Sequence, residues 1–449
     1  MKLQDQHGLE LSTSFASSAT AYDTALDLFN SWRMDPLALL APVLADDPDF
    51  IAGHLLQAGL MLSAFELPLF AAAAESLKLA AASRHTPTAR EQSLLAALTV
   101  WASGDMDAGL SGLDRHLVDH PRDLLALQLA HVGDLVLGRT TMLRDRIARV
   151  RRGHWSEEDA GYGYVLGMMA FGLEENFAFE RAESLGRRAV ELNAHDAWAV
   201  HAVAHVCEMQ GRAADGITWM NATRPAWRHD NGMAVHNHWH LALMHLAQGD
   251  RPAVLALYDE AVALTADVLT MNLADASSLL WRAHLRGLDV GSRWSALAQH
   301  WRAQGVWGSS AFFDMHAAMV FVAAGDSAAV DALRAAAGAA ATATPSGDAI
   351  WRRLMLPVID GFAALLDGQP TRCTELLLPL LPLTQPMGGS HAQRQVLLLT
   401  ALEAARRSGN RALTEALAAE QAVHRIDVPA LRRNSTSTPE RNTRALVAA

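Results

Sequence analysis

Apolar residues recur every three to four positions along almost the whole chain, the spacing of one helix face, and β-branched runs are scarce. Short turns of glycine followed by a polar residue separate the apolar segments. They are Gly104-Asp105, Gly249-Asp250, Gly325-Asp326 and Gly409-Asn410. Glycine supplies the left-handed residue that ends one helix, and Asp or Asn can cap the next. The pattern therefore predicts an all-α protein built from helix–turn–helix units.

These units repeat at a period of about 34 residues, the length of a tetratricopeptide repeat. Clear units run through 197–224 and 235–264, and looser ones through 311–338 and 370–420. We expect an α-solenoid of degenerate tetratricopeptide-like repeats that forms one superhelical domain over residues 1–424. An irregular all-helical domain is the alternative.

The last segment, 425–449, differs from the rest because it is polar, rich in arginine and poor in apolar residues. Such a composition does not bury enough apolar surface to fold, so we expect a mobile tail. A basic tail can contact an acidic partner, but a solvated chain end is the more common outcome.

Composition limits the classes of partner. The 449-residue chain has 48 acidic residues against 37 Lys and Arg, a formal net charge of −11, and a general nucleic-acid binder usually presents a basic face. Its two cysteines, Cys207 and Cys373, cannot build a disulfide framework, which suits a reducing compartment. We find no signal-peptide pattern and no run of about 20 apolar residues. We therefore expect a cytoplasmic protein with no nucleic-acid or membrane partner.

The 20 histidines are unevenly distributed, and the densest stretch lies in two consecutive units. His201, His205 and Glu208 are spaced i, i+4 and i+7, so they share one helix face. His236 and His240 share a face on the first helix of the next unit. Because first helices line the concave surface of such a solenoid, we expect these five residues to converge on one inner pocket.

Two chemistries fit this cluster, and a third possibility is that the histidines are ordinary core or surface residues. Paired histidines with a carboxylate have the ligand spacing of zinc and iron proteins. The sequence HAVAH lacks the glutamate of an HExxH protease, and no closed four-ligand spacing is present. We therefore expect no tightly held metal and no cofactor. We assign acid–base roles to the imidazoles, with Glu208 orienting one of them.

Other candidates lie farther along the chain. Asp275 and Arg282 are seven residues apart and share a helix face. The turn GGSHAQR places Ser390 as an N-cap, and Arg394 beside it can pair with an anion. No GxxxxGK[ST] or GxGxxG motif is present, so this is only a generic anion site. An aromatic wall that includes Trp239 would suit an apolar ligand.

Five stretches also carry a resemblance to a known family. They are DAWAVHAVAHVCEM, VHNHWHLAL, DASSLLWR with the following GSRW, FFDMHAAM and GGSHAQRQV. These stretches resemble the tetratricopeptide repeat protein 38 family of animals and bacteria, and the similarity covers nearly the whole chain. The resemblance implies a soluble, all-helical repeat protein and brings no biochemical activity with it. The chain departs from the family pattern at His238, where an aromatic residue is usual, and at His391, where Asn can stand.

The family pattern, as the resemblance implies it, includes counterparts of all five cluster residues and of seven others. We expect these seven to bind substrate: Trp239, Asp275, Arg282, Asp314, His316, Gln393 and Arg394. The leading hypothesis is a His-rich concave pocket that binds a small molecule and catalyses acid–base chemistry, such as a hydrolysis or an elimination. The alternative is a non-enzymatic scaffold that binds a peptide or protein in its groove. Lysines, which often clamp peptide carboxylates, occur only at positions 2 and 78, which favours the pocket.

Overall fold

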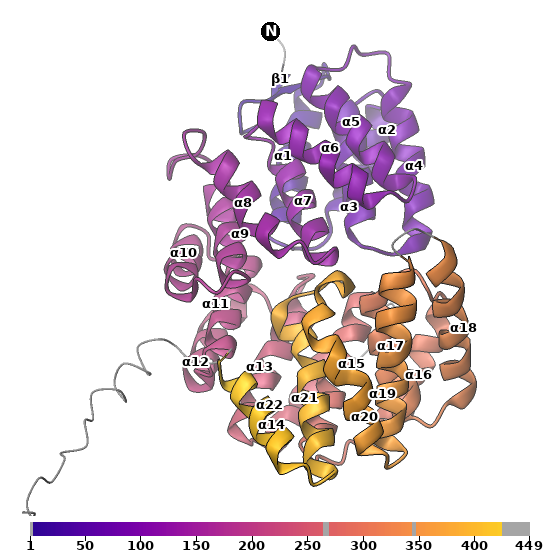
Figure 1. The fold of residues 1–449 in the computed structure, drawn as a ribbon. Helices are drawn as coiled ribbons and strands as arrows, with labels where there is room; N and C mark the ends of the chain where they lie inside the picture. The colour runs from indigo at the N-terminus through magenta and orange to yellow at the C-terminus, as the bar shows by residue number, and fades with distance from the viewer. Residues whose placement is uncertain (1–2, 264–268, 344–346, 424–449) are drawn as a thin grey trace, which may run out of the picture.

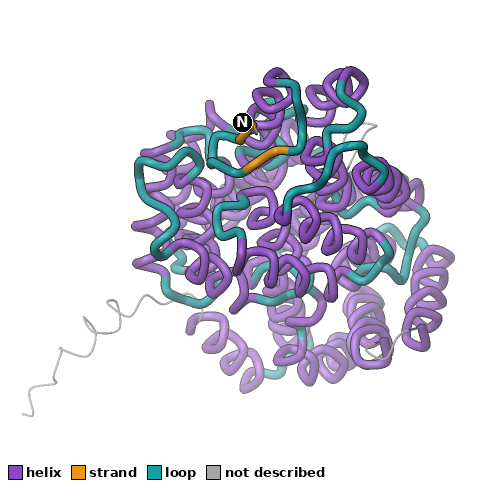
Figure 2. Tube along the Cα trace, turned by 90° about the horizontal axis from the view of Figure 1, so that it is seen from above, coloured by secondary structure: helices purple, strands orange, loops and turns teal. Residues whose placement is uncertain are grey.

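The computed structural model describes residues 3–263, 269–343 and 347–423. Within these ranges the chain folds into 22 α-helices and one two-stranded ribbon (Figure 1). Strand β1 (Leu3–Gln4) pairs antiparallel with β2 (Glu10–Leu11), and this ribbon is drawn in orange in Figure 2. The prediction of an all-α protein is confirmed.

Eight helices form the first part of the fold, coloured indigo to magenta in Figure 1. They are α1 (Ala16–Asn30), α2 (Pro36–Asp46), α3 (Ile51–Ser63), α4 (Leu67–Ala81), α5 (Ala89–Ala102), α6 (Met106–Asp119), α7 (Leu124–Val136) and α8 (Thr140–Arg151). Each contacts its neighbours in sequence, and α3 also contacts α5 and α7.

Eight further helices continue the array. They are α9 (Tyr162–Glu174), α10 (Phe179–Leu192), α11 (Ala197–Met209), α12 (Ala213–Thr223), α13 (Ala234–Gln248), α14 (Arg251–Leu257), α15 (Thr270–Leu285) and α16 (Arg293–Gln304). A 3-10 turn follows α12 at Arg224–Ala226, and a π-helical turn follows α14 at Tyr258–Val262.

Six helices complete the described chain. They are α17 (Ala311–Ala323), α18 (Ser327–Ala343), α19 (Leu356–Leu366), α20 (Pro370–Leu377), α21 (His391–Arg407) and α22 (Arg411–Val423). A π-helical stretch, Asp348–Met355, leads into α19, and 3-10 turns at Leu378–Leu383 and Gln385–Met387 lead from α20 towards α21.

The glycine–polar turns between helices have the expected conformation. Gly104, Gly249, Gly325 and Gly409 all have positive φ, the left-handed region that favours glycine. The polar residue after each glycine accepts a hydrogen bond from the backbone N–H three residues later, and these residues are Asp105, Asp250, Asp326 and Asn410. The predicted helix–turn–helix units are therefore confirmed at these four positions.

From α9 onwards the odd-numbered helices form an inner row. The contacts run from α9 to α11, α13, α15, α17 and α19 in turn, and the even-numbered helices pack outside them. Burial follows the same division. Every residue of α9 is buried, and every residue of α11 except Glu208, whereas α10 buries only Ala182, Gly186 and Ala189. The inner row supplies most of the core in this part of the chain, and it carries the histidine pairs.

Near the C-terminal end of the described chain, helix α21 returns to the inner row and contacts α11 and α15. Hydrogen bonds join the segment before α21 to the end of α7. The Gly389 N–H donates to the Leu135 carbonyl at 3.0 Å, and the Gln385 side-chain amide donates to the Gly138 carbonyl at 2.9 Å. Gly388 has φ +85°, and a Cβ built there would lie 2.1 Å from the Val136 carbonyl oxygen. Helix α21 and the turn before it thus cover part of the inner face of α11 and α15.

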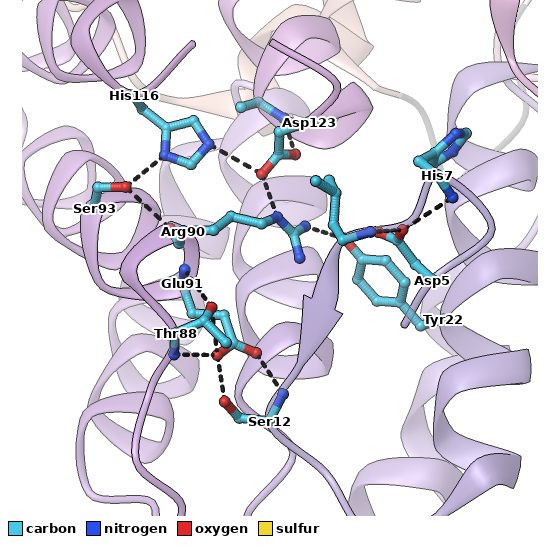
Figure 3. Close-up of polar contacts among 12 residues, drawn as sticks. Asp5, His7, Ser12, Tyr22, Thr88, Arg90, Glu91, Ser93, His116 and Asp123 are labelled. Atoms are coloured by element: carbon cyan, nitrogen blue, oxygen red, sulfur yellow. Dashed lines mark hydrogen bonds and ion pairs between the residues drawn. The ribbon is translucent and has the colours of Figure 1, made fainter. Parts of the chain in front are cut away.

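A buried polar network fixes the N-terminal segment to α5, α6 and α7 (Figure 3). The Arg90 guanidinium donates to Asp123 at 2.6 Å and to the Tyr22 hydroxyl at 2.8 Å. His116 contacts the same Asp123 oxygen at 3.0 Å, and the Ser12 hydroxyl donates to Glu91. Burial alone would raise the pKa of Asp123, but Arg90 and His116 together hold it well below its usual range.

Two further observations concern the whole described chain. Among its helices none is long and apolar enough to cross a membrane. The tail expected over 425–449 lies outside the described residues.

Candidate functional site

The two histidine pairs come together where α11 and α13 pack side by side in the inner row. His201 and His205 lie one turn apart on α11, and His236 and His240 lie one turn apart on α13. Ring centroids are 4.4 Å apart for His201–His205 and for His205–His240, and 4.8 Å for His201–His236 and for His236–His240. We call these four side chains the imidazole cluster. The structure brings them together as the helical spacing predicted.

A carboxylate from the next inner helix holds His236. Nδ1 of His236 lies 2.9 Å from both oxygens of Asp275 on α15. Because a carboxylate accepts, this nitrogen carries the proton, which leaves Nε2 of His236 as the lone-pair nitrogen. That Nε2 lies 3.0 Å from Nε2 of His201. In the structure the Asp275 carboxylate contacts this imidazole, and the expected role in substrate binding stays a prediction.

Two glutamates stand beside the other imidazoles. Nδ1 of His240 lies 2.8 Å from Glu208, the contact by which Glu208 was expected to orient one ring. Nδ1 of His205 lies 3.4 Å from Glu174, the last residue of α9. Glu174 was not among the predicted site residues, because a glutamate at the end of an apolar helix is ordinarily exposed and only the helix packing shows that it is buried.

Burial favours the neutral form of three of the imidazoles, those of His201, His205 and His240. Burial, with a further contribution from the neighbouring rings, lowers the pKa of His201 and His240 well below the usual range. Burial also lowers the pKa of His205 to about 4. Burial raises the pKa of Glu174 well above its usual range, and Glu208 adds to this effect. Neutral imidazoles present lone pairs, which is the form that accepts a proton or binds a metal.

Several nitrogens of the imidazole cluster have no hydrogen-bond partner among the described residues. They are Nδ1 of His201, both ring nitrogens of His205 and Nε2 of His240. His205 and His240 are 0% exposed to bulk solvent. Buried polar atoms are normally bonded, and exceptions are concentrated where a ligand or ion binds.

A cavity of about 130 Å³ lies on one side of the imidazole cluster and is lined by His201 and His236. Most of its wall is apolar and comes from distant parts of the chain, including Trp32, Phe65, Trp198 and Phe312. Its polar lining residues besides the two histidines come from several elements and are Ser63, Asn272, Ser310, Ser390 and Gln393. The cavity is comparable with one of about 150 Å³ that holds benzene.

A wider cleft of about 580 Å³ lies on another side and is lined by Glu208, Arg282, Gln395 and Arg406. None of the four imidazoles lines it. We therefore place the candidate ligand in the smaller cavity, because only there does a bound molecule meet the imidazoles.

Two of the expected substrate-binding residues pack against the imidazole cluster. Trp239 stacks on His236, with ring centroids 5.1 Å apart, and the Arg282 guanidinium lies over Trp239 at 5.4 Å. Arg282 also donates to the carbonyl oxygen of Ala392 at the start of α21. Both side chains are buried, so they support the imidazoles and the α15–α21 contact and do not face the cavity.

The expected residues at the start of α21 cap the helix. Ser390 accepts from the Gln393 N–H at 3.2 Å, and the Gln393 side chain accepts from the Ser390 N–H at 2.9 Å. The N-cap expected at Ser390 is confirmed, and Gln393 lines the cavity. Arg394 donates to the carbonyl oxygens of Gly388 and Gly389, so its guanidinium holds the preceding turn.

The remaining candidates lie outside the imidazole cluster. Asp314 accepts from the Gly308 N–H at 2.8 Å, and burial raises its pKa to about 7. The His316 ring donates to the Phe312 carbonyl at 2.7 Å, and burial lowers its pKa to about 3. These are local contacts within α17 and its N-terminal turn, and Nε2 of His316 has no hydrogen-bond partner among the described residues.

His238 and His391, the two positions that depart from the family pattern, have local or interhelical roles. The His238 ring donates to the Ala234 carbonyl at 2.8 Å and packs edge-on against Trp227. The His391 ring contacts the backbone carbonyl of Glu175 at 3.1 Å. No known protein-family model matches the chain. The resemblance to the tetratricopeptide repeat protein 38 family therefore stays a prediction.

Proposed function

We propose that the protein binds a small, largely apolar molecule in the 130 Å³ cavity and acts on its polar end with His201 and His236. The single observation that carries this proposal is the contact between the two Nε2 atoms at the cavity wall, 3.0 Å apart. The cavity volume limits the ligand to about the size of benzene with one polar group. Monocyclic aromatics and short aliphatic acids, amides or alcohols fit this description.

Acid–base chemistry fits the bonding of His236. Asp275 accepts from Nδ1 of His236, so Nε2 faces His201 with a lone pair. A carboxylate in this position fixes the tautomer and stabilises the imidazolium that forms when Nε2 takes a proton from a bound molecule. Proton transfer of this kind supports a hydrolysis or an elimination.

A peptide-binding scaffold is the second candidate, and the fold favours it less. Peptide recognition by a helical array needs a continuous open groove. Here α21 packs on α11 and α15, and the cavity beside the imidazole cluster is small and bounded by aromatic side chains. The two free cysteines, Cys207 and Cys373, are buried, which suits the cytoplasmic location that we propose.

Ligand binding is tested by a thermal-shift screen of monocyclic aromatics and short aliphatic acids, amides and alcohols, followed by calorimetry. The Ala64→Leu variant adds a side chain to the cavity wall, whereas Ala102→Leu makes the same change at the end of α5, outside the cavity. Hits should bind wild type and Ala102→Leu alike and lose at least tenfold in affinity in Ala64→Leu. Equal binding to all three proteins contradicts the proposed site.

The acid–base step is tested once a ligand is known, with product formation followed by mass spectrometry. Asp275→Asn should leave the ligand affinity within about threefold and lower turnover by about 100-fold or more, because the imidazolium loses its counter-charge. Binding without any conversion in wild type leaves a receptor and removes the catalytic part of the proposal. Capture of an extended peptide instead of small molecules would favour the scaffold.

A further inference from the structure

The hydrogen bonds around the imidazole cluster have a common direction. Asp275 and Glu208 bond to Nδ1 of His236 and His240, at 2.9 Å and 2.8 Å. Glu174 lies 3.4 Å from Nδ1 of His205 without a hydrogen bond, so it does not fix that ring. A carboxylate that accepts from Nδ1–H fixes the orientation of the ring and leaves the lone pair of Nε2 available to bind a metal ion. This arrangement recurs around metal-bound histidines, where the outer hydrogen bond sets the tautomer and makes the ligand more basic.

The distances between nitrogens suit one small ion. One ring nitrogen from each of the four histidines can be chosen so that all lie within 4.8 Å of one another. Around a transition-metal ion with bonds of about 2.0–2.1 Å, neighbouring nitrogens of a tetrahedron are about 3.3 Å apart. The His201–His236 pair is already at 3.0 Å. The longest separation needs to shorten by about 1.5 Å, shared between two rings.

The ring nitrogens without a hydrogen-bond partner also suggest that an ion binds between the imidazoles. His205 has no hydrogen bond at either ring nitrogen, and His240 has none at Nε2. Both side chains are 0% exposed. A folded protein rarely leaves such atoms unbonded, and a shared positive ion satisfies several lone pairs at once.

We propose that the imidazole cluster binds one divalent transition-metal ion through its four imidazoles, with Asp275 and Glu208 fixing two of the ligands. The ligands are His201, His205, His236 and His240. Imidazole ligands select ions such as Zn²⁺, Ni²⁺, Cu²⁺ or Fe²⁺ over Ca²⁺ and Mg²⁺, which require oxygen. Two nearby carboxylates balance the two positive charges of the ion.

A second group of possible ligands, Glu174, Glu175 and His205, shares one histidine with the first. It offers three donors instead of four, so we assign the ion to the imidazole cluster. This proposal departs from the expectation of no tightly held metal. That expectation rested on spacing along single helices, which shows neither the distance between helices nor the carboxylates at Nδ1.

The metal proposal goes beyond the proposed function and stands on the four imidazoles alone. It does not require the cavity to be occupied. The two proposals do meet at one atom, because Nε2 of His236 either accepts a proton or coordinates the ion. A bound ion would face the cavity along the edge between His201 and His236, which both line it.

The test uses the full-length chain purified without a histidine tag, stripped with a chelator and dialysed after addition of Zn²⁺. We expect one equivalent of zinc per chain by elemental analysis, and loss of at least 100-fold in Zn²⁺ affinity in His240→Ala. The control His120→Ala removes one member of another i, i+4 histidine pair, formed by His116 on α6 and His120 at the C-cap of that helix. It should keep the full equivalent of zinc. Less than about 0.2 equivalents in wild type, or equal zinc in all three proteins, overturns the proposal.

A measurement on wild type avoids any folding defect of a variant. Co²⁺ added to the stripped protein should give the intense visible absorption of a tetrahedral or five-coordinate site, and X-ray absorption of the zinc protein should show only nitrogen or oxygen neighbours with imidazole scattering. Six-coordinate Co²⁺ with no imidazole scattering refutes the site. Ala64→Leu should bind zinc like wild type, so failure of the cavity proposal and failure of the metal proposal give different results.

Discussion

Replacement of His205 by leucine should stabilise the metal-free protein, the opposite of what a core substitution normally does. His205 is 0% exposed, and neither ring nitrogen has a hydrogen-bond partner. A buried donor or acceptor without a partner costs about 1–3 kcal/mol. Leucine has a similar volume and carries no polar atom. Because burial raises the pKa of Glu174 well above its usual range, the substitution leaves no bare charge beside it.

After allowance for imperfect repacking, we expect the free energy of unfolding to rise by about 1–2 kcal/mol in the presence of a chelator. The midpoint temperature should rise by about 1–3 °C for a chain of this size. Zinc at 100 times its dissociation constant should stabilise wild type by about 2.7 kcal/mol and leave the variant unchanged. The order of the two stabilities should therefore reverse when zinc replaces the chelator.

The control for this prediction is His116→Leu. His116 is equally buried, but its two ring nitrogens contact Ser93 at 2.7 Å and Asp123 at 3.0 Å. Removing a satisfied ring should destabilise the protein by about 2–4 kcal/mol, because Ser93 and Asp123 lose a partner. Scanning calorimetry or urea denaturation compares the three proteins. If His205→Leu is less stable than wild type by more than about 1 kcal/mol in chelator, the nitrogens are bonded in solution and the reasoning is wrong.

Three further predictions concern the fold. Arg90→Met should lower the free energy of unfolding by about 3–5 kcal/mol in urea denaturation, because it leaves Asp123 buried without the guanidinium that pairs with it. The control Lys78→Met breaks an exposed ion pair and should change the free energy of unfolding by less than about 0.5 kcal/mol. The ion pair with Arg90 lowers the pKa of Asp123 in the folded state, so it stabilises the folded protein above about pH 4 and this stabilisation is lost as the pH falls. The difference in unfolding free energy between wild type and Arg90→Met should therefore shrink on acidification. A difference that stays constant with pH would contradict this prediction. Gly172→Ala should destabilise the protein by more than about 2 kcal/mol, because the new Cβ would lie 2.3 Å from the Leu143 carbonyl oxygen. Gly338→Ala has open space around the new Cβ, so in the same assay it should be neutral or stabilise the protein by up to about 1 kcal/mol.

The sequence was sufficient for the parts of the fold that depend on local chemistry. Helical periodicity and the glycine turns predicted the all-α structure, and the caps at residues such as Asp105 and Ser390 follow from side-chain type alone. The i, i+4 spacing also placed His201 with His205 on one face, and the assumption that α11 and α13 are neighbours brought His236 and His240 to them.

What the sequence did not predict depends on how one helix is rotated and shifted against another. Asp275 is 39 positions from His236, and Glu174 is 31 positions before His205, so only the packing of α15 and α9 brings these carboxylates to the rings. Arg394 illustrates the same limit. Its place beside glycines suggested an anion site, but its guanidinium is already bonded to their carbonyl oxygens.

The return of α21 has a consequence for the order of events during synthesis. Gly389, Ser390 and Gln393 line the cavity, and the Gly389 N–H is bonded to Leu135, more than 250 positions earlier. The ribosome must therefore release almost nine-tenths of the chain before the wall can close. Until then the nascent inner row exposes its apolar face and its histidines, so a chaperone can reach that surface before α21 covers it.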